Sequence, residues 1–399
     1  MATVSPLNPL HQQAEATFVM YGSGDPNSPG GGGSIAVVET FGELEAEYAA
    51  LRKGCVLMDL PHRGVIRVGG RERLDFLGRM VTQEMKGFAP GTVRRSFWLS
   101  RKGRIDADLT MVQLEDEMWI DADALVSART AAALSDFLFS EDVKIEDESA
   151  RMHRLALHGP TAAALLDAVS SPVVGPGASG TSDRGAGRIE IAGKPAVLFR
   201  DDSTGEAGFE LIVEIPDVPV VYEALLERGL AGFKLRTCGW HAFNIARIEA
   251  GRPLFHIDFG TESLAHETGP ECLADHVSFT KGCYLGQEIV ARMQSLGHPK
   301  QVLVGLKLDD DVVPTPGDEA PQRQPETGAS VLLGVEGAEA KPVGAVTSST
   351  RSPMLGDRPI CFAPVKWDQS KPGTRLLVAT AAGAVGATVQ PSLVFWSRA

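Results

Sequence analysis

The sequence has 399 residues, of which 43% are hydrophobic and 22% are charged, and its formal net charge is −13 at pH 7. This length predicts two or three domains, and the composition is that of a globular protein. The negative charge disfavours a nucleic-acid partner, because phosphate contacts need clustered Lys and Arg. No apolar run reaches the roughly 18 residues of a membrane span, so no membrane partner is expected.

The cysteines and histidines indicate neither a disulfide framework nor a metal site. No CxxC pair and no HExxH motif occurs, and the number of cysteines is odd. The N-terminus lacks the basic start and apolar core of a secretory signal, which predicts a cytoplasmic, reducing setting. The cysteines are Cys55, Cys238, Cys272, Cys283 and Cys361.

Residues 1–34 are rich in glycine and proline, which predicts an N-terminal arm that is partly flexible. After this arm, apolar periodicity predicts helices and strands in mixed order. In chain order these are helix 41–53, strand 64–70, helix 71–80, hairpin 104–121, helix 125–139, strand 155–157, helix 162–169, loop 170–187, strands 196–200 and 209–214, helix 220–228 ended by Gly229, and helix 238–249.

The helical period almost disappears after residue 300. Short strands separated by turn residues predict a small β-barrel or sandwich there. The candidate strands are 302–308, 330–334, 343–348, 360–364, 376–379 and 386–390. We therefore expect a body over residues 35–298, divided near residue 150, and a C-terminal β-barrel domain over residues 299–399.

The octapeptide KGCYLGQE, residues 281–288, places a cysteine between two glycines. The residues from Glu288 onward favour a helix, so Cys283 precedes a predicted helix N-terminus. The helix dipole and Lys281 would both favour a thiolate there. The alternative is a glycine turn around a buried and inert cysteine.

Two further segments carry carboxylates in patterns that suit chemistry. Glu206 lies between Gly205 and Gly208, and a bend there would aim its carboxylate at an amidine-like edge. Asp106 and Asp108 alternate with apolar residues and point to one side of a strand, where paired carboxylates do acid–base work or stabilise a cation. The alternatives are a hairpin turn with a solvated glutamate and the solvated face of an edge strand.

Arg247 lies near the end of the predicted helix 238–249. It is placed either to bind a ligand carboxylate or to complement the helix C-terminus.

These segments occur together with PLHQQAEATFVMYG, GRIDADLTM, LHGPTAAALL, STGEAGFEL and ARIEAGRPL, in that order along the chain. In this the chain resembles the aminomethyltransferase superfamily, whose founding member is the T-protein of the glycine cleavage system. The resemblance implies an α+β, folate-binding fold of two antiparallel-sheet subdomains plus a C-terminal β-barrel.

The resemblance also implies tetrahydrofolate, or a one-carbon-substituted form of it, as the cofactor. Glu206 would hold the pterin edge, and Arg247 would orient the site or the folate tail. Asp108 would lie near the nitrogen that carries the one-carbon unit, both binding folate and taking part in catalysis.

The octapeptide itself is similar to the signature of the YgfZ branch of this superfamily, whose members are folate-dependent helpers of iron–sulfur cluster assembly or repair. This resemblance predicts iron–sulfur client enzymes as partners and Cys283 as a catalytic or redox thiol. The motif residues are Lys281, Gly282, Cys283, Gly286, Gln287 and Glu288.

Two departures keep a second function open. Asp108 aligns with the catalytic aspartate of T-proteins, which favours an aminomethyltransferase acting with a lipoylated H-protein. Against that activity, Arg95 stands where T-proteins place a tyrosine, and Lys102-Gly103 replaces a Gly-Gly pair. The leading hypothesis is thus an iron–sulfur maintenance factor. The alternatives are a folate-dependent transferase and a folate-binding scaffold without chemistry, so the sequence leaves open whether the chain is an enzyme.

Overall fold

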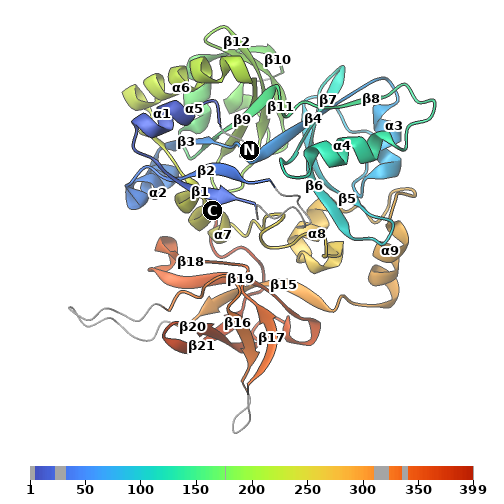
Figure 1. The fold of residues 1–399 in the computed structure, drawn as a ribbon, viewed down its shortest axis with the longest axis vertical. Coiled ribbons are helices and arrows are strands. Elements are labelled where there is room, and N and C mark those ends of the chain that lie inside the picture. Colours follow the sequence, from blue (N-terminus) through green and yellow to red (C-terminus); the bar gives the residue numbers. More distant parts are fainter. Residues whose placement is uncertain (1–4, 23–32, 176, 310–322, 335–339, 399) are drawn as a thin grey trace. The chain divides into compact units, whose positions relative to one another are not determined.

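The computed structural model describes residues 5–22, 33–175, 177–309, 323–334 and 340–398 (Figure 1). The chain forms two compact units, each assembled from three segments of the sequence. Unit 1 contains Met1–Ser100, Asp106–Phe243 and His276–Leu285, and unit 2 contains Arg101–Ile105, Asn244–Asp275 and Gly286–Ala399.

The N-terminal segment of unit 1 is structured where it is described. The helix α1 (Asn8–Gln13) precedes β1 (Thr17–Tyr21), which pairs antiparallel with β2 (Ile35–Thr40). Leu7 is fully buried in the core of unit 1, which fixes the start of α1. Most of the glycine-rich stretch after Gly22 lies outside the described residues.

A five-stranded sheet forms the first half of unit 1, in the order β5-β6-β7-β4-β8. The predicted hairpin is confirmed, because β6 and β7 pair antiparallel around a turn at residues 114–116. The strands and helices here are β4 (Arg63–Gly69), α3 (Arg73–Met80), β5 (Thr92–Leu99), β6 (Ile105–Gln113), β7 (Glu117–Asp123), α4 (Ser127–Ser135) and β8 (Lys144–Asp147). The helix α2 (Leu44–Lys53), which precedes them in the chain, packs against the other sheet of unit 1.

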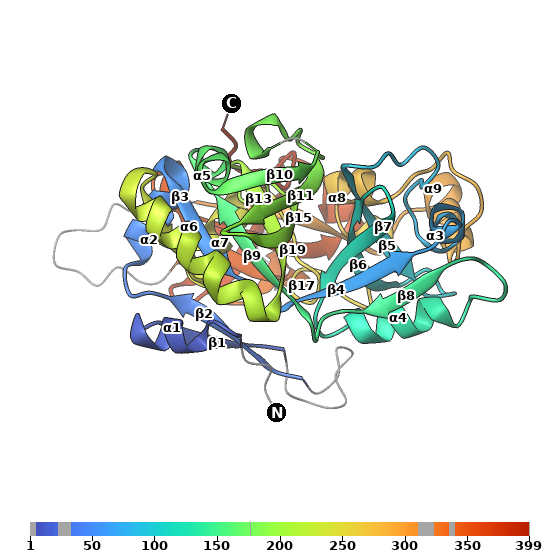
Figure 2. The ribbon, with the colours of Figure 1, turned by 90° about the horizontal axis from the view of Figure 1, so that it is seen from above.

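A seven-stranded sheet forms the second half, in the order β10-β11-β12-β13-β9-β3-β14. Its neighbours pair antiparallel except β14 and β3, which are parallel. The helices α5 and α6 pack on one face of this sheet (Figure 2). The elements are β3 (Cys55–Asp59), β9 (Met152–His158), α5 (Ala162–Val169), β10 (Ser170–Val174), β11 (Ala186–Ile191), β12 (Lys194–Arg200), β13 (Gly208–Glu214), α6 (Val218–Gly232) and β14 (Leu235–Thr237).

Six strands of unit 2 close into a barrel, because β15 pairs antiparallel with both β21 and β19. β18 is added outside this ring on β19. Apolar side chains from the ring strands fill the interior. The strands are β15 (Gln301–Leu308), β16 (Ser330–Leu333), β17 (Lys341–Ala345), β18 (Ser348–Ser352), β19 (Arg358–Lys366), β20 (Arg375–Thr380) and β21 (Gly383–Val389), and the helices are α8 (Pro270–His276) and α9 (Gln287–Leu296).

The α+β class, the antiparallel sheets and the C-terminal barrel are thus confirmed. The helix α7 (Trp240–Glu249) and the helix α5 match the predicted helices closely. Among the described residues, the helices are all too short or too polar to cross a bilayer.

Two predicted boundaries are wrong. The predicted loop 170–187 contains β10 and the start of β11, because edge-strand pairing outweighs the turn preference of its Ser, Gly and Pro residues. Gly229 does not end α6, which continues to Gly232. Gly229 is buried inside the helix, where a Cβ would lie only 2.6 Å from Cβ of Leu235, so this glycine allows close packing and does not act as a cap.

Candidate functional site

The two sheets of unit 1 face each other across an apolar layer. Val65, Val112 and Trp119 of the five-stranded sheet pack there with Phe199 and Ile212 of the seven-stranded sheet. Side chains alternate along a strand, so residues two or four positions from these point into the same space. Several of these positions carry charged side chains, such as Arg63, Asp121 and Glu210, and together they form a buried polar centre between the two sheets.

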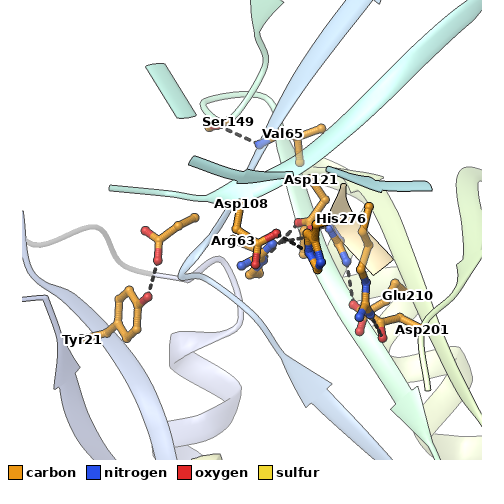
Figure 3. Close-up of polar contacts among 12 residues, drawn as sticks. Tyr21, Arg63, Val65, Asp108, Asp121, Ser149, Asp201, Glu210 and His276 are labelled. Atoms are coloured by element: carbon orange, nitrogen blue, oxygen red, sulfur yellow. Dashed lines mark hydrogen bonds and ion pairs between the residues drawn. The ribbon is translucent and has the colours of Figure 1, made fainter. Parts of the chain in front are cut away.

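We name this region the inner charge cluster (Figure 3). Its members come from β4, β5, β6, β7, β9 and β13, from the turn after β12, and from the C-terminal end of α8. They are Arg63, Arg95, Asp108, Asp121, Arg154, Asp201, Glu210 and His276.

Asp108 lies on β6 with its side chain one-quarter exposed, and its Oδ1 is 3.0 Å from Nε2 of His276. Burial alone raises the pKa of a carboxyl group. The charge and hydrogen bond of His276, with smaller contributions from Arg95 and Arg63, outweigh burial, so the pKa of Asp108 lies below its ordinary value. Asp108 is therefore held as a carboxylate at neutral pH.

The strand periodicity predicted for Asp106 and Asp108 is confirmed. Both are partly exposed, whereas Ile105, Ala107 and Leu109 between and beside them are fully buried. Of the two, Asp108 belongs to the inner charge cluster. Burial raises the pKa of Asp106, and Arg129 opposes this effect.

A chain of ion pairs joins the two sheets. Asp121 accepts hydrogen bonds from Nε of Arg63 at 3.2 Å and from its NH2 at 2.5 Å. Asp121 also accepts one from Arg154, whose other terminal nitrogen donates to Glu210 at 2.6 Å. Arg154 is 1% exposed, so both of its ion pairs are buried, where breaking one partner is costly.

A second link between the sheets joins Arg95 on β5 to Asp201 after β12, with NH2 of Arg95 donating to Oδ1 of Asp201 at 2.5 Å. The Arg95 guanidinium is therefore paired within unit 1. It also acts on Asp108, whose pKa it lowers.

An aromatic row lies beside this cluster. The ring of His62 is 5.1 Å from that of Tyr21 and 5.5 Å from that of Trp240. The hydroxyl of Tyr21 donates to Asp123. Burial, then the charge of Arg63, lowers the pKa of His62 to about 3, so its imidazole is neutral.

Glu206 lies on a turn between β12 and β13 and is 3% exposed. Gly205 has φ +76°, a conformation that favours glycine. Oε1 of Glu206 is 3.4 Å from NH1 of Arg52, which also donates to the carbonyl of Thr204 at 2.8 Å. The structure thus gives Glu206 a fixed and buried carboxylate rather than the solvated one of the alternative interpretation.

Arg247 lies in unit 2, where protein groups surround its guanidinium. NH1 donates to Asp258 at 2.5 Å, and NH2 donates to Oγ of Ser348 at 2.5 Å. Nε donates to Oδ1 of Asn244 at 2.9 Å. With 1% exposure, Arg247 is a buried hub that ties α7 to the strand β18.

The octapeptide is shared between the units, with Lys281 to Leu285 in unit 1 and the rest in unit 2. Nζ of Lys281 donates to the carbonyls of Val81 and Gln83, at 2.6 and 2.8 Å. Burial lowers the pKa of Lys281 to about 8. This lysine therefore anchors the segment to the chain after α3.

Cys283 is exposed, whereas the other four cysteines are buried. This excludes the buried thiol of the alternative interpretation. Gly286 has φ +81° and precedes α9, which contains Gln287 and the exposed Glu288. Gly282 has open space where a Cβ would lie. Among the described residues, no group of three His, Cys, Asp or Glu is placed to hold a metal ion.

Sequence reasoning missed Arg63, Asp121, Arg154 and Glu210. Glu210 lies inside the predicted strand 209–214 and Asp121 ends the predicted hairpin, whereas Arg63 and Arg154 stand one position before the predicted strands 64–70 and 155–157. The signal that would have found them is a charged residue at an inward position of a strand buried on both faces.

Comparison with protein families gives two adjacent matches. Residues 20–277 match the GCVT N-terminal domain, and residues 301–395 match the glycine cleavage T-protein C-terminal barrel domain. An aminomethyltransferase of Saccharopolyspora erythraea is 30% identical over 376 residues, covering 94% of this chain and 93% of the relative. One of Cutibacterium acnes is 31% identical over 369 residues, covering 88% and 90%.

A solved structure has the same fold. The glycine cleavage system aminomethyltransferase T from Bartonella henselae matches with a TM-score of 0.80 and 24% identity, covering 98% of each chain. The relatives carry the name aminomethyltransferase, which favours the alternative function over the YgfZ-type function expected first. By these matches the chain belongs to the folate-binding aminomethyltransferase superfamily, with both its GCVT N-terminal domain and its C-terminal barrel domain.

Proposed function

We propose that this chain is an aminomethyltransferase that passes a one-carbon unit from a lipoylated H-protein to tetrahydrofolate. The observation that carries the proposal is the state of Asp108, a partly exposed carboxylate kept ionised by His276, Arg95 and Arg63. A fixed carboxylate of this kind stabilises the positive charge that develops on an aminomethyl carbon as its bond breaks.

Two side chains on the turn before β13 support a folate-binding site. A pterin offers an amidine-like edge that pairs with a carboxylate through two parallel hydrogen bonds. Glu206 is buried, and the hydroxyl oxygen of Thr204 next to it is buried without a hydrogen-bond partner among the described residues. We propose that Glu206 holds the pterin edge and Asp108 faces the nitrogen that receives the one-carbon unit.

Arg247 has a smaller part in this proposal. Its donors already bond to Asn244, Asp258 and Ser348, so a folate carboxylate would have to displace one of these groups. We propose that Arg247 orients the site by holding α7 in place.

The test uses aminomethyl-loaded, lipoylated H-protein and tetrahydrofolate, and measures ammonia release with formation of methylenetetrahydrofolate. We expect turnover by the native chain and a loss of about a hundredfold or more in Asp108→Asn. The matched control is Asp106→Asn, two positions earlier on the same face of β6, which should stay within about twofold. No turnover by the native chain, or equal loss in both variants, would reject the proposal.

A second candidate is iron–sulfur cluster maintenance, which the exposure of Cys283 favours. The two functions separate in a deletion strain complemented with Cys283→Ala or Asp108→Asn and scored by iron–sulfur enzyme activity and by growth on glycine as nitrogen source. Loss of iron–sulfur activity in Cys283→Ala alone supports this candidate. Full rescue by Cys283→Ala with failure of Asp108→Asn on glycine supports the transferase.

A further inference from the structure

Glu210 is a buried carboxyl group that the proposed chemistry does not use. It lies on β13, is 6% exposed, and faces the five-stranded sheet because Leu211 and Phe209 on either side of it face the helices. Its Oε2 accepts a hydrogen bond from Arg154 at 2.6 Å, and its Oε1 is 3.7 Å from Nε2 of His158.

The inner charge cluster contains more carboxylates than guanidinium groups. Its three guanidinium groups belong to Arg63, Arg95 and Arg154. Its four carboxylates belong to Asp108, Asp121, Asp201 and Glu210. Arg154 is divided between Asp121 and Glu210, so these two carboxylates compete for one cation.

Burial and three neighbouring charged groups set the pKa of Glu210. Burial raises its pKa, the Arg154 guanidinium on β9 opposes burial, and Asp201 and Asp121 raise the pKa further, so that it lies at about 7. His158, also on β9, has its pKa lowered by burial to about 4 and stays neutral while Glu210 titrates. Burial and the two neighbouring carboxylates thus bring the pKa of Glu210 into the neutral range.

The chain of contacts from Glu210 ends at Asp108. Arg154 connects Glu210 to Asp121, and Asp121 holds Arg63 through two hydrogen bonds. The charge of Arg63 in turn acts on Asp108 (Figure 3). The chain therefore links a carboxyl on the seven-stranded sheet to the carboxylate proposed to face the reacting carbon.

We propose that Glu210 is a positioning residue for Asp108, which acts by holding or releasing a proton at the far end of the chain Glu210–Arg154–Asp121–Arg63. This inference rests on the transfer reaction proposed above. With Glu210 protonated, Arg154 bonds fully to Asp121, and Arg63 is left to compensate Asp108. With Glu210 ionised, Arg154 is shared between Glu210 and Asp121, and Asp121 bonds more strongly to Arg63. Arg63 then compensates the negative charge of Asp108 less, so Asp108 stabilises the reacting cation more.

The expected consequence is a rise in kcat as pH passes through neutrality. One unit of charge relayed through a buried cluster changes a rate by about three- to tenfold. In Glu210→Gln the rise should disappear and kcat at pH 8 should fall by that factor, with the KM for folate unchanged. The matched control is Glu214→Gln, at the exposed end of the same strand, which should keep the native profile.

Two further variants and one measurement separate this role from a purely structural one. Arg154→Lys keeps the charge but lacks the fork that reaches both carboxylates, so it should weaken the pH step without abolishing activity. Glu210→Asp, which keeps a carboxyl group, should show part of the rise in kcat with pH that Glu210→Gln lacks. Carboxyl-selective ¹³C NMR should show a glutamate that titrates near neutrality, absent in Glu210→Gln, and a matching small step in the Asp108 resonance.

The outcomes distinguish the inference from the function on which it rests. Coincident midpoints of the NMR titration and the kcat profile support it. A Glu210 that titrates in the ordinary glutamate range, or a Glu210→Gln profile that keeps the step, overturns it. If the native chain performs no transfer while the Asp108 resonance still follows Glu210, the transferase proposal fails and the electrostatic link stands.

Discussion

Nε2 of His276 lies 3.0 Å from Oδ1 of Asp108, although the two residues are 168 positions apart in the chain. Two further contacts hold His276 in place, one through its ring and one through its backbone. Its ring stacks on Phe97 with centroids 4.3 Å apart, and the backbone carbonyl of His276 accepts a hydrogen bond from Thr82 at 2.7 Å. His276, the last residue of α8, is thus the direct hydrogen-bond partner of Asp108, the carboxylate proposed to face the reacting carbon.

The first prediction concerns His276→Gln, which keeps a hydrogen-bonding group and removes the charge. Because His276 lowers the pKa of Asp108, its loss raises that pKa, and Asp108 then becomes protonated at a higher pH. The acid limb of kcat/KM against pH should move to higher pH. An unchanged acid limb would show that His276 does not set the ionisation of Asp108. His241→Gln, at an exposed histidine, is the control.

The second prediction concerns Arg247→Met. The substitution leaves Asp258 and Ser348 without their cationic partner in a buried position. Removing one partner of such a pair costs about 3–5 kcal/mol of unfolding free energy. Urea denaturation should register this loss, whereas Arg292→Met on the exposed side of α9 should change stability by no more than about 0.5 kcal/mol. Equal unfolding free energies of the two variants would argue against a stabilising role for the buried contacts of Arg247.

The third prediction concerns acid stability and Asp59, which accepts hydrogen bonds from Ser5 at 2.5 Å, His11 at 2.8 Å and His153 at 2.6 Å. Burial acts to raise the pKa of Asp59, but the charges and hydrogen bonds of the two histidines outweigh it and hold the pKa well below its usual range.

Such a carboxylate stabilises the fold above its unfolded-state pKa, and the contribution is lost as pH falls toward the folded-state pKa. The native chain should therefore lose stability steeply below about pH 4. Asp59→Asn should be less stable at pH 7 and show a flatter acid profile in thermal melts, with faster proteolysis of the segment before β1. Asp183→Asn, at an exposed site, should follow the native curve.

The fourth prediction concerns the thiols. Cys283 is exposed, whereas burial raises the pKa of Cys55, Cys238 and Cys361. Ellman's reagent should titrate about one thiol per native chain and all the cysteines in denaturant. Cys283→Ala should abolish the native reaction, and Cys361→Ala should leave it intact. Two or more fast thiols in the native chain would contradict the buried placement of the other cysteines.

Local pattern was sufficient for much of the fold. The helix over residues 162–169 follows from its apolar spacing, and the partly exposed pair Asp106 and Asp108 follows from strand alternation. The failures came where pairing partners distant in the chain decide the structure. β10 forms because β11 offers it an antiparallel edge, which the residues of β10 do not indicate by themselves.

The inner charge cluster could not be predicted for a related reason. Arg154 and Glu210 each look like single charged residues inside apolar strands, and they are 56 positions apart. Their pairing depends on the register of β9 and β13, in which Leu155 is opposite Leu211. Register is a tertiary property, so the sequence signals of the two strands did not reveal it.

The hydrogen bonds between α7 and β18 limit which domain exchanges between related genes would preserve the fold. Arg247 donates to Ser348, and Ser352 donates to the buried carboxylate of Glu249, across 101 and 103 positions of the chain. A recombination event that exchanged the barrel for that of a relative would remove one buried hydrogen bond from the Arg247 guanidinium and one from the Glu249 carboxylate, unless the incoming strand carried the same hydroxyl groups. We therefore expect recombinant proteins that fold to have inherited α7 and β18 from the same parent.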